Sequence, residues 1–225
     1  MTYEGETNEN GEPHGHGVKW YLDAHFYEGQ WKNGKSHGHG VFEWEDGTRY
    51  EGQWKDGRED GQGVKEWPNG TRYEGQWRDG IGHGQGIFES PDGHRYEGQM
   101  KFGKCHGQGV KQWPNGTRYE GQWRGGIGHG QGIVESPDGS RFEGQIKDGL
   151  RHGHGILEID GIRLEGGFKK GNFHGRILVI KQSGDKVIML WENGEHVSNE
   201  SAPPLNIEEL ISLIIQINQD MEEIR

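Results

Sequence analysis

A four-residue motif recurs in this chain at a fixed interval of 23 residues. The motif YEGQ, or FEGQ in the last case, opens units at Tyr27, Tyr50, Tyr73, Tyr96, Tyr119 and Phe142. Looser copies begin at Tyr3 and Leu164. A period of this length is typical of arrays in which each repeat contacts mainly its neighbours. Residues 50–95 and 96–141 differ at only nine of 46 positions, which indicates that a pair of repeats was duplicated.

Each repeat has the pattern of one β-hairpin. Residues 50–54 alternate aromatic residues or glycine with polar residues, as a β-strand does. Residues 55–57 predict a hairpin turn, residues 61–67 predict the second strand, and Pro68-Asn69-Gly70 turns the chain into the next repeat. We therefore expect an all-β repeat fold, an elongated single-layer antiparallel β-meander of hairpins.

The alternation also assigns the two faces of this sheet. Tyr50, Gly52 and Trp54 share one face, where aromatic rings can lie across the bare backbone of glycines and form the core. Arg49 and Glu51 lie on the other face and recur in the next repeats as ladders of alternating charge. We expect this second face to be solvated, and a binding surface is the alternative.

The repeat unit resembles a known family. The pattern Y-E-G-x-W-x-x-G-x-x-H-G-x-G, as in Tyr73 to Gly86, is similar to the MORN repeat (membrane occupation and recognition nexus). The resemblance covers about residues 3–175 in seven or eight copies. It implies a non-enzymatic scaffold. The departures include Asp60 in place of His and Met100 in place of Trp.

The opening unit adds a narrower resemblance. Residues 3–17, with the pattern Y-E-G-x-x-N-x-x-G-x-x-H-G-x-G, are most similar to the start of the radial spoke head proteins of motile cilia. This resemblance implies a structural role in the axoneme of a cilium or flagellum, with spoke-head or other axonemal subunits as protein partners. The alternatives are a lipid-associated scaffold and a regulatory subunit that positions an enzyme.

The amino-acid composition further limits the classes of binding partner to expect. The 25 Lys and Arg residues against 36 Asp and Glu give a net charge of −11, which disfavours nucleic acid and anionic lipid as partners. No leader pattern and no long apolar run are present, and Cys105 is the only cysteine. These features predict a cytoplasmic protein in a reducing compartment.

No motif predicts an active site, a cofactor or a metal. Histidines recur as a column at His37, His83, His106, His129 and His152. Equivalent strands two steps apart in a sheet are separated by about 9–10 Å, too far for their histidines to share one metal ion. We therefore expect each histidine to bond to the neighbouring turn, with chelation by a local His-x-His pair as the minor alternative.

The C-terminal part departs from the repeat. Residues 176–197 predict a degenerate hairpin that caps the repeats, residues 198–204 a linker, and residues 205–225 an amphipathic α-helix. The helix carries a seam of apolar side chains with 3-4 spacing at Ile207, Leu210, Ile214, Ile217, Met221 and Ile224. A helix this short needs a partner surface, which is another protein, a second copy, or the chain's own sheet.

Partner contacts are expected from this seam and from tryptophans of the repeats. The tryptophans chosen as contact candidates are Trp31, Trp54, Trp77 and Trp123.

Overall fold

The computed structural model describes residues 1–22 and 25–199. Their strands form one antiparallel sheet of 18 strands, which confirms the predicted all-β meander. The predicted helix over residues 205–225 and its apolar seam lie outside the described residues. The chain divides into two compact units, Met1–Gly107 and Gln108–Arg225, and each unit is described by itself.

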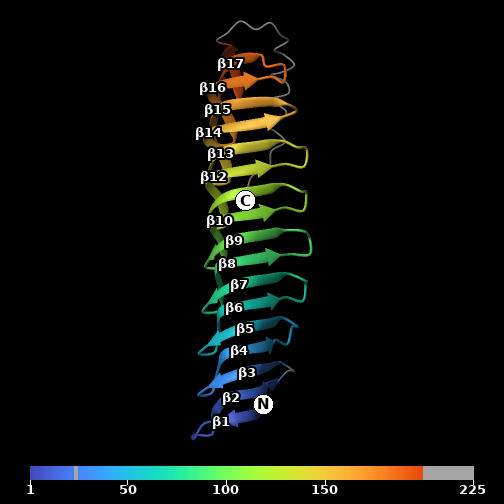
Figure 1. The fold of residues 1–225 in the computed structure, drawn as a ribbon, viewed down its shortest axis with the longest axis vertical. Helices are drawn as coiled ribbons and strands as arrows, with labels where there is room; N and C mark the ends of the chain where they lie inside the picture. Colours follow the sequence, from blue (N-terminus) through green and yellow to red (C-terminus); the bar gives the residue numbers. More distant parts are fainter. Residues whose placement is uncertain (23–24, 200–225) are drawn as a thin grey trace. The chain divides into compact units, whose positions relative to one another are not determined.

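In the first unit each strand pairs with the strand that follows it in the sequence (Figure 1). The strands are β1 (Thr2–Thr7), β2 (Pro13–Trp20), β3 (Phe26–Lys32), β4 (Lys35–Glu43), β5 (Arg49–Lys55), β6 (Arg58–Glu66), β7 (Arg72–Arg78), β8 (Ile81–Glu89) and β9 (Arg95–Lys101). The boundary between the units falls within β10 (Lys104–Gln112).

The second unit has the same succession of pairs. Its strands are β11 (Arg118–Arg124), β12 (Ile127–Glu135), β13 (Arg141–Lys147), β14 (Leu150–Ile159), β15 (Ile162–Lys169), β16 (Asn172–Ile180), β17 (Lys186–Glu192) and β18 (Glu195–Asn199). The aliphatic segments 177–180 and 187–191 lie in the paired strands β16 and β17. The sequence analysis did not anticipate β18.

A β-bulge interrupts the register inside each hairpin. Gly52 of β5 pairs with Gly63 of β6, whereas Trp54 pairs with Glu59, so one residue of β5 faces three residues of β6. The second strand therefore begins at Arg58, three residues before the predicted start. Between hairpins the register is regular, as it is from β6 to β7.

Aromatic rings cover the glycine pair on one face. Tyr50 is fully buried and Trp54 is 6% exposed. The Tyr50 ring meets Trp54 and Trp77 edge to face, with ring centres 5.1 and 5.3 Å apart. The Tyr50 hydroxyl donates to the carbonyl oxygen of Gln53 at 2.9 Å, and Trp54 Nε1 donates to the carbonyl oxygen of Gly40 at 3.0 Å. The aromatic core is where the alternation predicted it.

Backbone hydrogen bonds connect hairpin tips to the preceding repeat. In the turn between β5 and β6, Asp56 and Gly57 have φ angles of 50° and 88°, the left-handed geometry of a two-residue hairpin turn. The Gly57 amide donates to the carbonyl oxygen of Ser36 in the preceding hairpin at 2.9 Å. The tip is therefore held in place and does not project freely.

We expect Gly63→Ala to destabilise the protein strongly, because a Cβ at this position would lie 2.2 Å from the Tyr50 hydroxyl oxygen. Overpacking of a core costs about 1–3 kcal/mol, and this contact belongs at the upper end. The control is Gly57→Ala, where a Cβ meets no atom within 4 Å. The only cost there is that alanine must adopt a positive φ, which destabilises the protein by about 1 kcal/mol. Urea unfolding compares the two variants, and equal losses would contradict the role given to the ring.

The buried tyrosines predict a steep loss of stability in alkali. Burial raises the pKa of Tyr73 and of Tyr119 to about 12, and it raises the pKa of Tyr27, Tyr50 and Tyr96 as well. An unfolded tyrosine has a pKa of about 10, so above that pH the unfolded chain loses protons that the folded chain keeps. The contribution of the buried, protonated tyrosines to the free energy of unfolding is complete below about pH 10. It falls by about 1.4 kcal/mol per pH unit for each tyrosine as the pH rises toward about 12.

We therefore expect tyrosinate absorbance and loss of the far-ultraviolet circular dichroism signal to change together in one cooperative transition in this pH range. Ionisation of these tyrosines near pH 10 with an intact sheet would contradict this expectation.

Candidate functional site

The face opposite the aromatic rings, here called the polar face, carries a central row in which glutamates alternate with aliphatic residues. Glu28 of β3 lies between Val18 of β2 and Val41 of β4, and Val41 in turn pairs with Glu51 of β5. Every second strand of the first unit thus presents a carboxylate on this row. Because neighbouring strands are about 4.8 Å apart, successive carboxylates are separated by about 9.6 Å.

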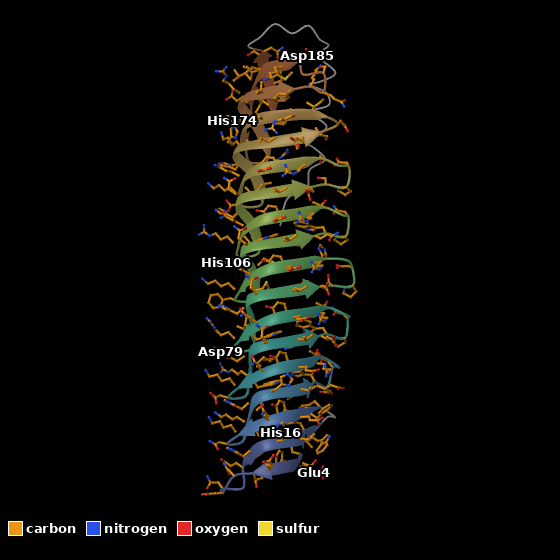
Figure 2. The ribbon with its side chains drawn as sticks, in the orientation of Figure 1. Glu4, His16, Asp79, His106, His174 and Asp185 are labelled. Carbon is orange, nitrogen blue, oxygen red and sulfur yellow. The ribbon has the colours of Figure 1, made fainter. Side chains whose placement is uncertain are left out.

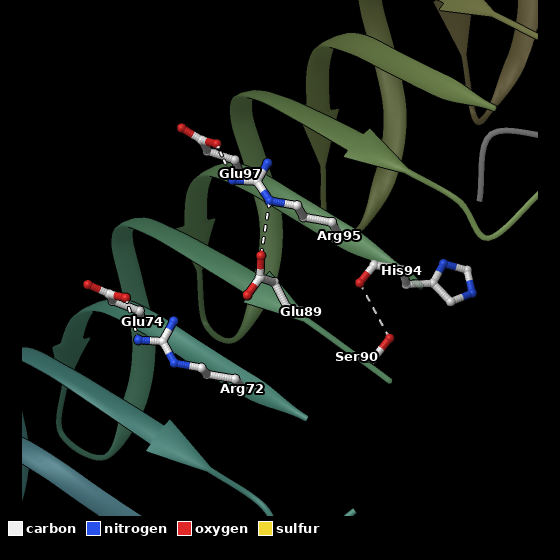
Figure 3. Close-up of polar contacts among 7 residues, drawn as sticks. All are labelled: Arg72, Glu74, Glu89, Ser90, His94, Arg95 and Glu97. Atoms are coloured by element: carbon white, nitrogen blue, oxygen red, sulfur yellow. Dashed lines mark hydrogen bonds and ion pairs between the residues drawn. The ribbon is translucent and has the colours of Figure 1, made fainter. Parts of the chain in front are cut away.

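Arginines neutralise most of these carboxylates. Arg72 Nη2 lies 2.6 Å from Glu74 Oε2, and Arg95 Nη2 lies 2.7 Å from Glu97 Oε2 (Figure 3). Arg95 Nε also lies 3.1 Å from Glu89 Oε1, and the hydrogen bond to Glu97 raises the pKa of Arg95. Half-exposed pairs of this kind contribute about 0–1 kcal/mol each, so they chiefly cancel charge on the polar face.

The pattern of neutralisation fails at the N-terminal end. Glu51 pairs with Arg49, two residues before it, but the equivalent positions before Glu4 and Glu28 are Thr2 and Phe26. Within residues 1–22 and 25–199, neither Glu4 nor Glu28 forms an ion pair. Two carboxylates of the row therefore have no arginine partner among the described residues.

A groove lies over this same end of the polar face. It has a volume of about 630 Å³ and combines carboxylates, aliphatic side chains and the bare backbone of glycines. It is lined by Glu4, Gly5, His16, Gly17, Val18, Glu28, Gly29, Gln30, His39, Gly40, Val41 and Glu51. Figure 2 labels Glu4 and His16, which come from the neighbouring strands β1 and β2.

Glutamine side chains keep one wall of the groove rigid. Gln30 Oε1 accepts a hydrogen bond from the His39 amide at 2.7 Å, which closes the bulge between β3 and β4. A Cβ on Gly38, which has a φ of 63°, would lie 1.9 Å from this oxygen. At the end of the sheet Glu6 takes the place of glutamine and accepts from the His16 amide at 3.0 Å. The groove is therefore largely preformed.

The tryptophans expected to contact partners lie in the aromatic core. Trp31, Trp54, Trp77 and Trp123 are 3–7% exposed. Each indole Nε1 donates to a glycine carbonyl oxygen at 3.0 Å. The burial gives these rings a packing role, and their contact with a partner stays a prediction.

Several histidines of the column face the next hairpin turn. His37 Nδ1 lies 3.8 Å from Asp56 Oδ1, and His129 Nδ1 lies 3.9 Å from Asp148 Oδ1. Asp60, which replaces histidine in its repeat, accepts from the Asp79 amide at 3.4 Å. The histidine distances are too long for hydrogen bonds, and His37 Nδ1 has no hydrogen-bond partner among the described residues, so the expected bond to the turn is made by Asp60 but not by His37.

In residues 1–22 and 25–199 no three His, Cys, Asp or Glu side chains gather in an arrangement suited to a metal ion. In the same part of the chain no helix has the length and apolar character needed to span a membrane.

The groove was not predicted from the sequence. The charges of the polar face were expected to form ladders of alternating charge, a pattern that the two units without the arginine do not follow. The signal was available, because Thr2 and Phe26 stand where later repeats have arginine.

Three solved structures with a similar course of the chain are domains of SAS-4 and CPAP proteins. The TCP domain of Drosophila melanogaster SAS-4 (dCPAP), in complex with a proline-rich motif of Ana2, is 14% identical, with 73% of this chain and 85% of that chain covered and a TM-score of 0.38. The G-box domain of the microcephaly protein CPAP is 12% identical, with coverages of 79% and 99% and a TM-score of 0.41. The TCP10 domain of Danio rerio CPAP is 13% identical, with coverages of 88% and 94% and a TM-score of 0.31. Likeness at this level carries no argument about function.

The family assignment comes from the repeats themselves. A search among curated proteins finds no match. The model of the MORN repeat matches residues 9–23, 27–49, 50–72, 73–95, 96–118, 119–141 and 142–159, which together make up more than half of the chain. These are the hairpins whose rings, glycines and bulges are described above, and this chain belongs to the MORN repeat family.

Proposed function

We propose that this protein is a non-enzymatic scaffold that binds a segment of a partner protein in the groove of its polar face. The observation that carries the proposal is the coincidence of the groove with the two carboxylates, Glu4 and Glu28, that no arginine neutralises. Membership of a family of repeat scaffolds supports an interaction role.

The spacing of the carboxylates selects the conformation of the bound segment. A polyproline II helix rises about 3.1 Å per residue with three residues per turn, so every third side chain points the same way at about 9.3 Å intervals. This interval matches the separation of about 9.6 Å between carboxylates two strands apart. A segment with Lys or Arg at every third position and small apolar residues between them therefore fits Glu4, Glu28 and the valines beside them.

We expect Glu4→Gln combined with Glu28→Gln to weaken binding of such a peptide about tenfold, as two contacts of about 0.7 kcal/mol each are lost. The probe is a proline-rich peptide with lysine at every third position, and its affinity is measured by fluorescence anisotropy. The matched control is Glu74→Gln with Glu97→Gln, which removes two carboxylates that arginines already neutralise. Equal weakening by both pairs, or no binding, would count against the groove.

We further propose that the scaffold belongs to the radial spoke head of a motile axoneme, and that the apolar seam from Ile207 to Ile224 docks it there. The support is the resemblance of residues 3–17 to the start of spoke head proteins, together with the 3-4 spacing of the seam.

We expect the tagged full-length chain to stay with the axoneme of ciliated cells after detergent extraction, and a version ending at Ser201 to be released. Immunoblotting of the axonemal and soluble fractions measures both. Release of the full-length chain together with the membranes would favour a lipid-associated scaffold, and its release into the cytosol would favour a regulatory subunit.

A further inference from the structure

One hairpin tip of the first unit differs in chemistry from the others. The turns that follow β3, β5 and β7 begin with Asn33, Asp56 and Asp79, all with φ near 50°. Asparagine and aspartate tolerate this left-handed geometry better than other side chains that carry a Cβ. The turn after β9 begins with Phe102, which has a φ of 51° and is 71% exposed. A bulky aromatic residue is thus held in a strained conformation and in water.

The fold gains little from this phenylalanine. In an equivalent tip, Asp56 lies 3.8 Å from His37 of the preceding hairpin. Phe102 has a loose edge contact instead, with its ring centre 6.2 Å from that of His83, and the Lys101 ammonium lies 5.9 Å from its ring. Strain that the local packing does not require is characteristic of positions kept for function.

The internal duplication points to the same hairpin. Of the nine differences between residues 50–95 and 96–141, five fall in the seven residues from Met100 to His106. One of them places Phe102 where the other copy has Asp56. The two copies have therefore diverged mainly at this tip and the start of the strand after it.

The tip is rigid and has an apolar neighbour. The Gly103 amide donates to the carbonyl oxygen of Gly82 at 3.0 Å, which ties the turn to the hairpin before it. Ile81 of that hairpin is 46% exposed, and its Cγ2 lies 3.6 Å from the position of a Cβ on Gly103. Phe102 and Ile81 thus offer two exposed apolar side chains on a fixed backbone.

Basic side chains outnumber acidic ones next to these two side chains, and the carboxylate of Asp79, in the same tip as Ile81, lies 3.2 Å from Arg58. All three of the cations are exposed: Arg78 pairs with Ile81 across the hairpin of β7 and β8, Lys101 precedes Phe102, and Lys104 lies two residues after it. None of the three makes an ion pair with any residue of the ranges 1–22 and 25–199. In a chain with a net charge of −11, this is a local reversal of sign.

We propose that Phe102 and Ile81 anchor a second protein-binding site, separate from the groove, for a partner segment that carries an apolar side chain flanked by carboxylates. The apolar pair receives the partner's apolar side chain, and the three cations attract its carboxylates. A protein segment is favoured over an anionic membrane because the neighbouring tips carry Asp56 and Asp79, which a charged bilayer surface would also meet.

The test uses the full chain and a library of 12-residue peptides, each with one Phe, Leu, Ile or Trp among random Asp, Glu, Ser and Gly. The variant Phe102→Asn should fold as well as or better than the wild type, because asparagine suits the left-handed turn. We expect it to bind the selected peptides at least tenfold more weakly, with an equal or higher melting temperature. Asp56→Asn, at the equivalent tip without the apolar pair, is the control and should not change the affinity.

Four outcomes would overturn the proposal. The first is equal affinity of Phe102→Asn and the wild type for the selected peptides, and the second is equal affinity of the wild type for peptides in which serine replaces the apolar residue. The third is that no peptide is selected at all, and the fourth is binding only to vesicles of phosphatidylcholine with phosphatidylserine. Because Phe102→Asn leaves the groove intact, its effect on the acidic peptides is independent of the lysine peptide used for the groove.

Discussion

The fold depends on a tyrosine ring that lies over a pair of facing glycines. Gly52 and Gly63 oppose each other so closely that a Cβ on the first would lie 2.4 Å from Cα of the second. The Tyr50 ring fills the space above them, and its edges meet Trp54 of its own repeat and Trp77 of the next. A single repeat cannot complete this arrangement, because Tyr50 needs a tryptophan from the following hairpin. The hairpins are therefore stable only in succession.

This core leaves the opposite face free to vary. The aromatic face supplies the burial, and the half-exposed arginine–glutamate pairs of the polar face each contribute only about 0–1 kcal/mol. Omission of an arginine before Glu4 or Glu28 therefore has little effect on stability but a large effect on local charge. The glutamine that closes the bulge in most repeats, such as Gln30, is different, since its carbonyl oxygen satisfies a backbone amide. Variation on the polar face is thus less restricted in the charged and aliphatic rows than in the glutamine row, where Glu6 keeps the same hydrogen bond to a backbone amide.

The sequence was sufficient for features that follow from period and alternation. The 23-residue interval predicted the hairpins, and the shared parity of Tyr50, Gly52 and Trp54 predicted the aromatic face. The bulge was not predictable from alternation, because three residues of β6 face one of β5 and the strict period of two is lost. The groove was missed for another reason. It depends on residues that break the repeat, and a search for regularity averages such residues out.

Departures from a repeat can be interpreted by where they lie, since the other copies serve as references. Arg151 occupies the position that Glu59 holds in an earlier repeat, and it is 4% exposed with its guanidinium 5.3 Å from the Phe168 ring. Burial lowers the pKa of Arg151 to about 10, which still leaves the guanidinium charged at neutral pH, and the group packs against the rings of Phe142 and Phe168 in the core. Phe102 departs in the opposite direction, since an apolar ring replaces a carboxylate on the outside. An inward departure such as Arg151 can be explained by the core around it, whereas the outward departure at Phe102 gains no comparable packing from the described residues and is accounted for by the contact proposed above.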